Sequence, residues 1–512
     1  MAKWLVRTLA ACLLSLATLS ATAQTVTRPF SALRPTGGAA AAAHALVVEL
    51  SPREALSGVH LRLASAAALP AGARYLVWVN GAPVAEVDAN EAEQTLALSP
   101  NAFVPGTNSI QLALMPRAAA ISAETALANL APIDDARSSV SLDFAGLRAD
   151  TAPTLAQLPV AFDRRAWMPR TVTVELGGDS TSPEQLRAAA LAVEGIEARM
   201  RQVDVTAAYQ GESAIVARES DPASWMIAPE AALAGDILLV GTRKALADLL
   251  PASVARAITG PFLGLYSANQ GKSVVVVLSG INDADCVHAA QAFADTAMVF
   301  PARSAIVLGE ATAIHAPQTH RAVSLGQKDP ALVRAALNFA AIRVRATGAL
   351  TDFTFTFSSD GTNADLFFGR DAALSAHLRR QLPVYPTLQP GQAVSLPGSS
   401  GVQRFIAVLG NGNASVASAV EMLRQPATWS LFTRGPTLFD TAAKSAVPLT
   451  VARRSPVATL RLLLDDLRVF WSVFVALLVL LPIFLNVTLK AQVAKRLGAG
   501  NHSSSSGTPP KQ

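Results

Sequence analysis

The stretch RFIAVLGNGNASVASAVEML, residues 404–423, shows how the C-terminal half of this chain is built. An apolar run from Phe405 to Leu409 meets a turn at Gly410 and Gly412, and an alanine-rich helical pattern follows. A dinucleotide-binding fingerprint has the same layout, with the phosphate lying on the helix N-terminus. The stretch predicts a strand, a tight turn and a helix, and it raises the question of whether a nucleotide binds at the turn.

A second stretch, VVVVLSGINDADCVHAAQAF at residues 274–293, repeats the same plan about 130 residues earlier. Each copy has an apolar strand that ends in leucine, a Gly/Asn turn and an alanine-rich helix. Residue 415 is serine, where a dinucleotide fingerprint needs a third glycine or alanine. The repeat therefore favours the tight turn of a duplicated α/β unit, and we expect no nucleotide cofactor.

Strands alternate with helices over residues 168–310, which predicts an open α/β domain. The run RTVTVELGGD is typical of a strand, and DILLVGT is typical of a buried parallel strand. Between them, Ser182 as N-cap, Pro183 at the first helical position and Gln185 three residues after the cap predict a capping box.

Residues 40–150 alternate polar and apolar side chains in short runs, which predicts a β-sandwich or jelly roll. The run RYLVWVNGAPVAEVDA indicates a hairpin around Asn80-Gly81. Later, DFTFTFSSDGTNADLFFGR alternates from Phe353 and turns at Asp360-Gly361, which predicts another hairpin. We therefore assign residues 311–400 to a reduced second β module and residues 401–450 to a second, partial α/β unit.

The N-terminus has the features of a secretory signal peptide, which we place at residues 1–23. Lys3 and Arg7 precede an apolar run, and small residues follow it. Cleavage there would remove Cys12 and leave Cys286 without a disulfide partner in its own chain. The formal net charge of +5 comes largely from the two chain ends, so no nucleic-acid partner is expected.

An apolar stretch, residues 469–489, is long enough to span a bilayer of about 30 Å. Lys490, Lys495 and Arg496 follow it without acidic residues, so the positive-inside rule predicts a cytoplasmic tail at 490–512. The body would then be periplasmic, and the chain a single-pass protein of the inner membrane. Trp471 suits an interfacial position.

Residues 456–468 have the spacing of an amphipathic helix that lies in the membrane surface or packs on a partner. The alternative is a juxtamembrane helix with a solvated face. Its apolar side consists of Val457, Leu460, Leu463, Leu464 and Leu467.

Several stretches resemble, in order, parts of one known family, the periplasmic regulatory subunits of bacterial cellulose synthase. They are YLVWVNGAPVAEV (75–87), LAQLPVAFDRR (155–165), DILLVGT (236–242), ITGPFLGLY (258–266) and VVVVLSG with HAAQAFA (274–294). The resemblance implies jelly-roll carbohydrate-binding-like domains, flavodoxin-like α/β domains and one C-terminal transmembrane helix, an α+β multidomain fold. The second half, from residue 311, is shorter than that pattern, which indicates a compact or divergent member.

The resemblance also implies a function without catalysis. Members of the family pack on the membrane-embedded cellulose synthase catalytic subunit and guide the glucan polymer across the periplasm. Cyclic di-GMP controls that complex, but it is cytoplasmic, so no site for it is expected on this chain. Sugars stack on exposed aromatic rings, and the candidates at 40–150 are Tyr75, Trp78 and Phe103.

Tyr75 and Trp78 lie on opposite faces of one predicted strand, so at most one of them points outward. Burial in the core is the alternative for Trp78. For catalysis, LPGSSGV lacks the second glycine of a nucleophile elbow, and no metal-ligand spacing is present. We therefore expect a non-catalytic subunit without cofactor or metal. A membrane-anchored periplasmic hydrolase or esterase is the alternative.

Overall fold

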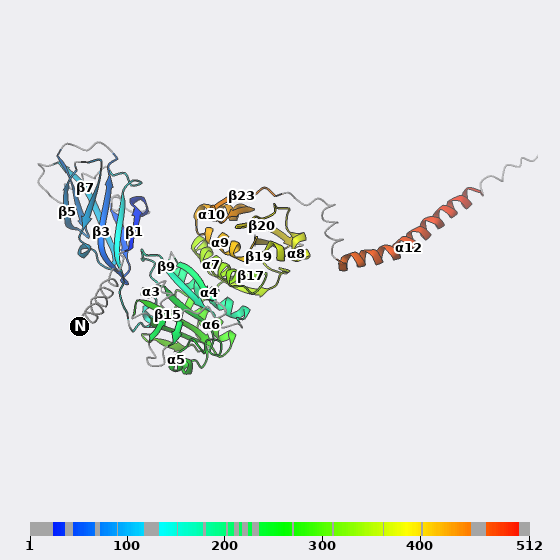
Figure 1. Ribbon diagram of the computed structural model, residues 1–512, viewed down its shortest axis with the longest axis horizontal. Coiled ribbons are helices and arrows are strands. Elements are labelled where there is room, and N and C mark those ends of the chain that lie inside the picture. The colour runs from blue at the N-terminus through cyan, green and yellow to red at the C-terminus, as the bar shows by residue number, and fades with distance from the viewer. Residues whose placement is uncertain are drawn as a thin grey trace, which may run out of the picture.

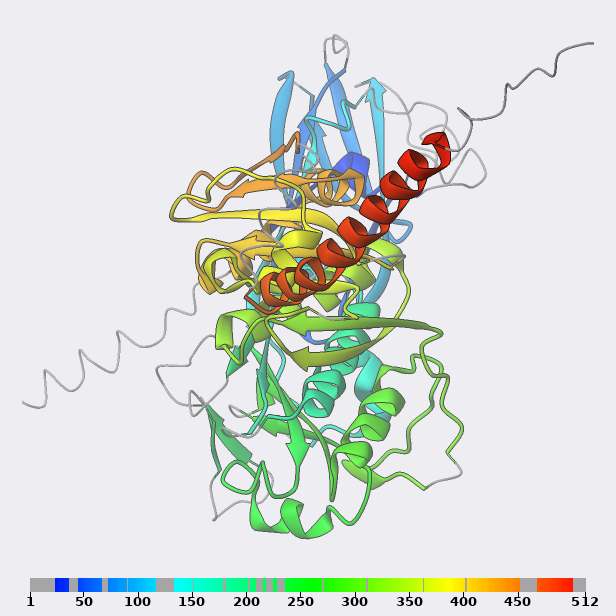
Figure 2. The same ribbon diagram turned by 90° about the vertical axis from the view of Figure 1, so that its right-hand side faces the viewer.

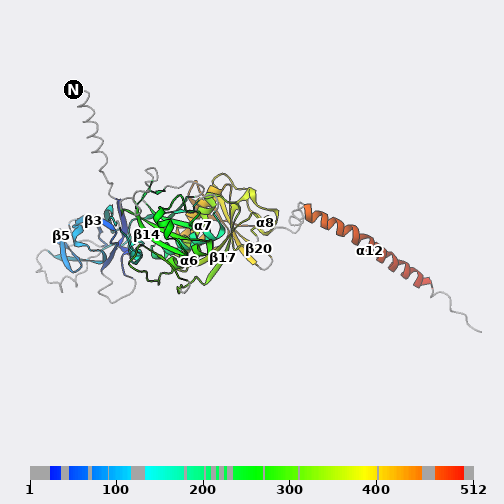
Figure 3. The same ribbon diagram turned by 90° about the horizontal axis from the view of Figure 1, so that it is seen from below.

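The computed structural model describes residues 24–35, 45–66, 72–89, 91–116, 133–150, 152–177, 181–200, 203–208, 215–217, 224–227, 235–268, 271–309, 312–361, 363–400, 403–451 and 467–500. These residues form a β-sandwich, two α/β domains and one long C-terminal helix (Figure 1), which confirms the predicted α+β multidomain class. The sandwich and the two α/β domains follow one another along the long axis (Figure 3). The predicted signal peptide, residues 1–23, lies outside the described residues.

The sandwich has the strand order of a jelly roll, because its eight antiparallel strands form the sheets β1-β8-β3-β6 and β2-β7-β4-β5. Alternating side chains from both sheets meet in one core, in which Leu61, Val77 and Phe144 are buried. The strands are β1 (Gln24–Pro29), β2 (Leu46–Leu50), β3 (Glu54–Ala64), β4 (Ala73–Val79), β5 (Ala82–Asp88), β6 (Glu93–Leu98), β7 (Gly106–Pro116) and β8 (Ser139–Leu147).

The predicted hairpin at Asn80-Gly81 is confirmed, because β4 and β5 pair across this two-residue turn. Both turn residues have positive φ, 52° for Asn80 and 79° for Gly81, as a type I′ turn requires.

The segment that follows the sandwich is fastened to it through Trp167. The indole of Trp167 is buried in the sandwich core, and its Nε1 donates to the carbonyl of Glu49 at 2.7 Å. The carboxylate of Glu54 accepts the backbone N–H groups of Trp167 and Met168 at 2.8 and 2.7 Å. Short helices η4 (Leu155–Gln157) and α3 (Leu158–Ala161) precede this anchor. The linker is therefore part of the packed structure.

The first α/β domain has the strand order β10-β9-β13-β15-β14-β12-β11, with β16 beside β14. The strands β10, β9, β13 and β15 are parallel, and β14 is antiparallel to β15. Its elements are β9 (Arg170–Glu175), α4 (Pro183–Arg199), β10 (Val203–Ala208), β11 (Ile215–Ala217), β12 (Ser224–Ile227), β13 (Asp236–Thr242), α5 (Ala252–Ala257), β14 (Phe262–Ala268), β15 (Ser273–Gly280), α6 (Asp283–Ala294) and β16 (Ala305–Val307). The capping box predicted for Ser182 and Gln185 is present at the start of α4.

The second α/β domain has the order β18-β17-β19-β21-β20-β22-β23. Its elements are β17 (Thr319–Leu325), α7 (Pro330–Thr347), β18 (Thr351–Phe357), β19 (Leu366–Arg370), η7 (Asp371–Ala373), α8 (Ala376–Gln381), β20 (Gln392–Ser400), β21 (Gln403–Gly410), α9 (Asn413–Met422), α10 (Pro426–Arg434), β22 (Thr437–Asp440) and β23 (Ser445–Pro448).

The two α/β domains share one topology. When β11 and β12 are set aside, the first five strands of each domain lie in the order 2-1-3-5-4, with strand 4 antiparallel to strand 5. The repeated stretches occupy equivalent places, as β15 with α6 and β21 with α9, which confirms the predicted duplication. The first three strands have the order 2-1-3, as in a flavodoxin-like sheet. The fourth strand is antiparallel, whereas all strands of a flavodoxin-like sheet are parallel.

The hairpin predicted around Phe353 is wrong. Strand β18 pairs in parallel with β17, and β19 lies on the other side of β17, so β18 and β19 do not pair with each other. Phe353 and Phe355 are buried on the one face of this edge strand that helices cover. Buried and exposed side chains therefore alternate along β18 with the same period of two as in a sandwich strand. Residues 311–400 are therefore the first half of the second α/β domain rather than a reduced β module, and residues 401–450 are its second half.

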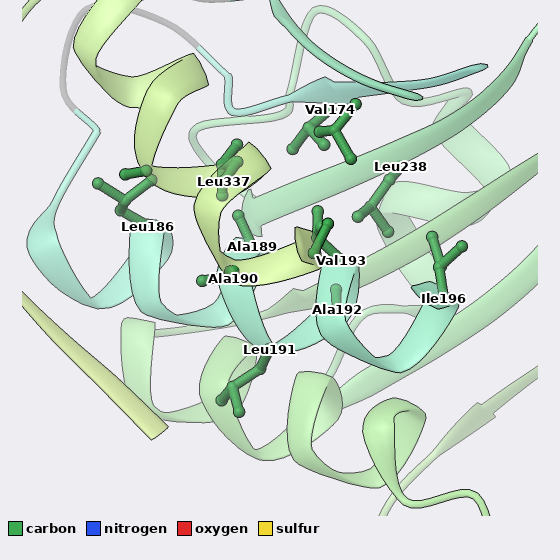
Figure 4. Close-up of a cluster of buried hydrophobic side chains, with 14 of the residues drawn as sticks. Val174, Leu186, Ala189, Ala190, Leu191, Ala192, Val193, Ile196, Leu238 and Leu337 are labelled. Carbon is green, nitrogen blue, oxygen red and sulfur yellow. The ribbon is translucent and has the colours of Figure 1, made fainter. Parts of the chain in front are cut away.

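A continuous core joins the two α/β domains. Helix α4 packs between α6 and α7, and α7 packs between α4 and α9. In addition, α4 reaches β18 of the second sheet, and α7 reaches β10 of the first. Figure 4 shows Leu337 beside the small side chains of Ala189 and Ala190, where the helices approach.

Ion pairs and hydrogen bonds tie the two domains together around this core. Arg187 binds both carboxylate oxygens of Asp352 at 2.6 Å. Arg345 binds the carboxylate of Glu197 at 2.6 and 3.2 Å. Because these carboxylates are buried, the ion pairs fix how the domains meet.

Helix α12 (Leu467–Gly500) continues without a break through Pro482 (Figure 2). Its segment Phe474–Val493 is long and apolar enough to cross a membrane, and none of it is buried against the described protein. The predicted span, residues 469–489, falls within α12. The helix also continues through residues 490–500, which the sequence assigned to the tail, because alanine, lysine and arginine there favour helix. Residues 501–512 lie outside the described part.

Candidate functional site

Two of the three aromatic residues predicted to contact sugar are buried in the sandwich. Tyr75 is 1% exposed and Phe103 is 8% exposed, and both pack in the core between the two sheets. Burial raises the pKa of the Tyr75 hydroxyl, which a hydrogen bond with Ser65 partly opposes. Side chains so enclosed offer no surface to a polysaccharide, so the prediction is wrong for Tyr75 and Phe103.

Trp78 lies on the opposite face of β4 from Tyr75, as the alternation predicted. It is partly exposed and packs at the edge of a small apolar cluster on the outer face of sheet β2-β7-β4-β5. The cluster consists of Leu76, Ala113 and Met115. An ion pair between Arg74 and Glu86 lies on the same face, since Leu76 is opposite Glu86. Trp78 is therefore the one predicted aromatic residue whose position permits stacking with a sugar.

The predicted membrane and partner contacts fall mostly outside the described residues. Leu460, Leu463 and Leu464 are in the undescribed stretch, and Leu467 is the first residue of α12. Trp471 is 56% exposed, and its ring packs edge-on against Phe474 with centroids 5.8 Å apart. An exposed indole near the start of an apolar helix fits an interfacial position.

The glycine turns quoted from the sequence are filled by the protein itself. A Cβ added at Gly410 would lie 2.6 Å from the carbonyl oxygen of Gly412 and 2.9 Å from a methyl group of Val416. At the equivalent Gly280, a Cβ would lie 2.0 Å from the Cβ of Asp285. Glycine is required at both positions because the helix packs directly on the end of the strand. This agrees with the interpretation of the repeated stretches as tight βα turns.

A histidine–carboxylate pair lies on the outer face of sheet β1-β8-β3-β6. His60 Nε2 is 2.9 Å from Asp143 Oδ2, and Thr25 Oγ1 donates to Asp143 Oδ1 at 2.6 Å. The hydrogen bond from Thr25 lowers the pKa of Asp143, and His60 adds to the effect. Within the described residues, no group of three or more His, Cys, Asp or Glu residues could hold a metal ion.

A pocket of about 370 Å³ lies where the linker meets the sandwich. Two of its arginines already have partners within the protein. Arg165 binds Asp163 at 2.7 Å, while Arg28 stacks over the Trp167 ring at 4.2 Å and donates to the carbonyl of Ala166. These contacts hold the domain junction, so we assign this pocket a structural role.

A second pocket, of about 470 Å³, lies in the second α/β domain and is called here the arginine pocket. The parallel strands contribute residues near their starts, among them Arg321 of β17, Leu366 of β19 and Arg404 of β21. The pocket therefore opens at the amino edge of the sheet, whereas ligands of open α/β sheets usually bind at the carboxyl edge. Helices α7 and α10 complete the wall with Phe339, Arg343, Thr347, Trp429, Phe432 and Thr433.

Three aromatic rings pack together on the helical side of the arginine pocket. The ring centroids of Phe339 and Trp429 are 6.1 Å apart, those of Trp429 and Phe432 are 5.7 Å apart, and those of Phe339 and Phe432 are 6.0 Å apart. Phe339 and Phe432 are buried, whereas Trp429 is partly exposed. The pocket thus has a preformed apolar wall with the indole at its surface.

Cationic groups outnumber anionic groups around this pocket. Arg321 is 3.6 Å from the carboxylate of Asp365, and that carboxylate also accepts the N–H of Ala322 at 2.8 Å. Arg343 donates to the carbonyl of Ala349 at 3.3 Å, and Arg404 is exposed without an ion pair among the described residues. Burial lowers the pKa of Arg343, the nearby carboxyl group of Glu194 partly opposes this, and repulsion from Arg321 adds to the decrease.

The carboxyl group behind Arg343 does not balance its charge. Glu194 is fully buried, and burial raises its pKa to about 9. At this pKa the acid is largely protonated at neutral pH, so it offsets little of the positive charge of Arg343. Sequence reasoning missed this site because its residues come from six separate segments. Only the folded sheet brings them together.

Comparisons with known proteins identify no family. No protein-family model matches the chain, and no curated protein matches it. A family two carbohydrate esterase from Cellvibrio japonicus is 14% identical over 37% of this chain and 54% of that chain, with a TM-score of 0.12. An acetyl xylan esterase from Butyrivibrio proteoclasticus is 12% identical over 37% and 49%, with a TM-score of 0.13.

A family two carbohydrate esterase from Clostridium thermocellum, solved with cellohexaose, is 11% identical over 63% of this chain and 87% of that chain, with a TM-score of 0.10. This chain spans about half the length of the first two esterases. At these TM-scores, the likeness carries no argument about fold or function.

Proposed function

We propose that this protein is a non-catalytic, membrane-anchored subunit of a cellulose or related exopolysaccharide synthase complex. Its body lies in the periplasm, and its C-terminal helix crosses the inner membrane. In this role the chain supports the membrane-embedded glycosyltransferase and guides the nascent glucan. The protein itself makes and breaks no glycosidic bond.

The observation that carries the proposal is the order of the parts. A jelly roll with Trp78 on its outer face is joined to two α/β domains of one topology, and one apolar helix closes the described chain. The ties at Trp167 and between α4 and α7 join the three domains into a continuous packed body. Such a body holds a sugar-stacking face in a defined position relative to the rest of the complex.

The C-terminal region supplies the contacts to the membrane and the partner. Helix α12 has an apolar surface that is fully exposed in the isolated protein, so a bilayer or another apolar helix must cover it. The residues proposed to contact the catalytic subunit or the membrane surface are Leu460, Leu463, Leu464, Leu467 and Trp471.

Affinity purification from detergent-solubilised membranes tests the proposal. Three chains are compared: the wild type, a chain that ends at Ser455, and a full-length chain in which residues 456–466 are replaced by a Gly/Ser linker. A processive glycosyltransferase should co-purify with the wild type and not with the truncated chain. The linker chain separates anchoring by α12 from binding by the amphipathic segment.

Absence of a transferase from all three preparations would contradict the proposal. Release of acetate or reducing sugar from a polysaccharide by the purified full chain would favour the alternative, a membrane-anchored polysaccharide-modifying enzyme. A His60→Ala variant is the matched control in that assay. Loss of turnover in this variant would assign the activity to the His60–Asp143 pair.

A further inference from the structure

We propose that the arginine pocket binds an acidic saccharide, with the sugar ring against Trp429 and its carboxylate held by Arg343 and Arg404. The inference rests on the proposed function, because a guided polymer must pass a surface that recognises it. It adds a chemical class and selects the related exopolysaccharide over cellulose, because a polymer recognised here carries uronic acid residues and cellulose carries none. Trp78 on the jelly roll, by contrast, would accept neutral sugars as well.

The charges of the pocket favour an anionic ligand. Asp365 is the one acidic side chain that lines the described pocket, and it already lies 3.6 Å from Arg321. Arg343 contacts a backbone carbonyl at 3.3 Å, and Arg404 has no ion pair among the described residues. Guanidinium groups present parallel N–H donors that match the two oxygens of a carboxylate. An acidic group at this position would relieve the repulsion between Arg321 and Arg343.

The aromatic wall and the polar rim select a sugar over an aliphatic anion. A pyranose has an apolar face that can lie against the exposed part of Trp429 and hydroxyl groups that need hydrogen-bond partners. Asp365, Thr347 and Thr433 line the same pocket and can accept hydrogen bonds from such hydroxyls. A fatty acid would instead bury its hydrocarbon against the Asp365 carboxylate, which costs free energy.

The size and the position of the pocket agree with this ligand. A volume of about 470 Å³ lies within the range of roughly 300–1,000 Å³ that ligand sites occupy. The backbone N–H of Leu449 donates to the carbonyl of Pro436 at 2.8 Å, three residues after Thr433 of the pocket. Strand β23 therefore ends close to the C-terminal end of α10, which lines the pocket.

Calorimetric titration of the detergent-solubilised full chain tests the proposal with three probes. Trigalacturonate carries the ring and the carboxylate, cellotriose carries the ring alone, and acetate carries the carboxylate alone. We expect trigalacturonate to bind at least tenfold more tightly than cellotriose, acetate to bind too weakly to measure, and the affinity for the uronate to fall with added salt. Equal affinity for trigalacturonate and cellotriose, or no binding of trigalacturonate at millimolar concentration, would overturn the proposal.

Variants then place the binding in the pocket. Arg343→Gln should weaken trigalacturonate binding about tenfold or more, because it removes a charged hydrogen-bond donor. Trp429→Ala should weaken it by a similar factor. Arg370→Gln is the matched control, since Arg370 is an exposed arginine at the opposite end of strand β19 and should leave binding unchanged. Thermal unfolding of each variant verifies that it is folded.

An equal loss in Arg343→Gln and Arg370→Gln would contradict the assignment of the site. The results also separate this inference from the proposed function. If a glycosyltransferase co-purifies but trigalacturonate does not bind, the pocket inference fails and the subunit role stands. If trigalacturonate binds through Arg343 but no transferase co-purifies, the pocket stands and the subunit role fails.

Discussion

Replacement of Glu194 by glutamine should stabilise the protein at neutral and alkaline pH. Glu194 is fully buried between the two α/β domains, where its carboxyl accepts the N–H of Thr351 at 2.7 Å. Burial raises its pKa to about 9, and Asp352 of β18 adds to the increase, while the Thr351 N–H and Arg343 of α7 oppose it. Its second oxygen has no hydrogen-bond partner in the described structure. Glutamine has nearly the same shape and keeps an oxygen that can accept the Thr351 N–H, but it cannot ionise.

The magnitude follows from the difference between the folded and unfolded pKa. Below the unfolded value of about 4.5, both states are protonated and the residue costs nothing. Between that value and about 9, the unfolded chain ionises while the folded chain keeps its proton, so stability falls by about 1.4 kcal/mol per pH unit. Wild type should therefore lose about 3 kcal/mol at pH 7 that Glu194→Gln retains.

Urea unfolding of the detergent-solubilised full chain at pH 5 and pH 8 measures this difference. The stability advantage of Glu194→Gln should widen by roughly 4 kcal/mol between the two pH values. Glu197→Gln is the matched control on the same helix, because it weakens the pair with Arg345 and should destabilise instead. An advantage that is constant from pH 5 to pH 8 would refute the reasoning, since it would show that Glu194 titrates equally in both states.

Three further predictions concern the sandwich, the domain interface and the cysteine. Trp78→Ala should abolish co-sedimentation with insoluble glucan at an unchanged unfolding temperature, while Tyr75→Ala should lower the free energy of unfolding by about 3 kcal/mol or more. Binding that survives Trp78→Ala would exclude the outer face. Asp352→Asn, which removes the buried carboxylate bound by Arg187, should cost about 3 kcal/mol in urea unfolding. A loss below about 1 kcal/mol would show that this pair does not hold the domains. Cys286 is fully buried, and burial raises its pKa to about 12, so a thiol reagent at pH 8 should label it only after denaturation. Labelling of the native protein would contradict the observed packing.

Local signals in the sequence predicted the elements whose causes are local. The capping box at Ser182 and the turn at Asn80-Gly81 depend on residues within four positions of each other, and both are present. The alternation around Phe353 also predicted a strand, but not its neighbours in the sheet. An edge strand under helices has the same period as a sandwich strand, and its partner β17 is set by contacts about 30 residues away.

The candidate site shows the same limit. Alternation placed Tyr75 and Trp78 on opposite faces, but it does not indicate which face is the core, so the prediction for Tyr75 is wrong. The arginine pocket combines Arg321, Arg404 and Trp429, which are far apart in the chain and follow no common spacing. Such a site becomes visible only when the sheet order is known.

Helices α4 and α7 pack against each other as equivalent helices do in a two-fold symmetric dimer, although both belong to one chain. Each also contacts the second strand of the other domain: α4 contacts β18, and α7 contacts β10. In a true homodimer, both copies of the interface carry the same residue at every position. A fused pair is free of that restriction. Counted from the proline that starts each helix, Glu194 corresponds to Ala341, and Asn338 corresponds to Leu191. One buried acid and one buried amide therefore make the interface directional, and each half can pair correctly only with the other.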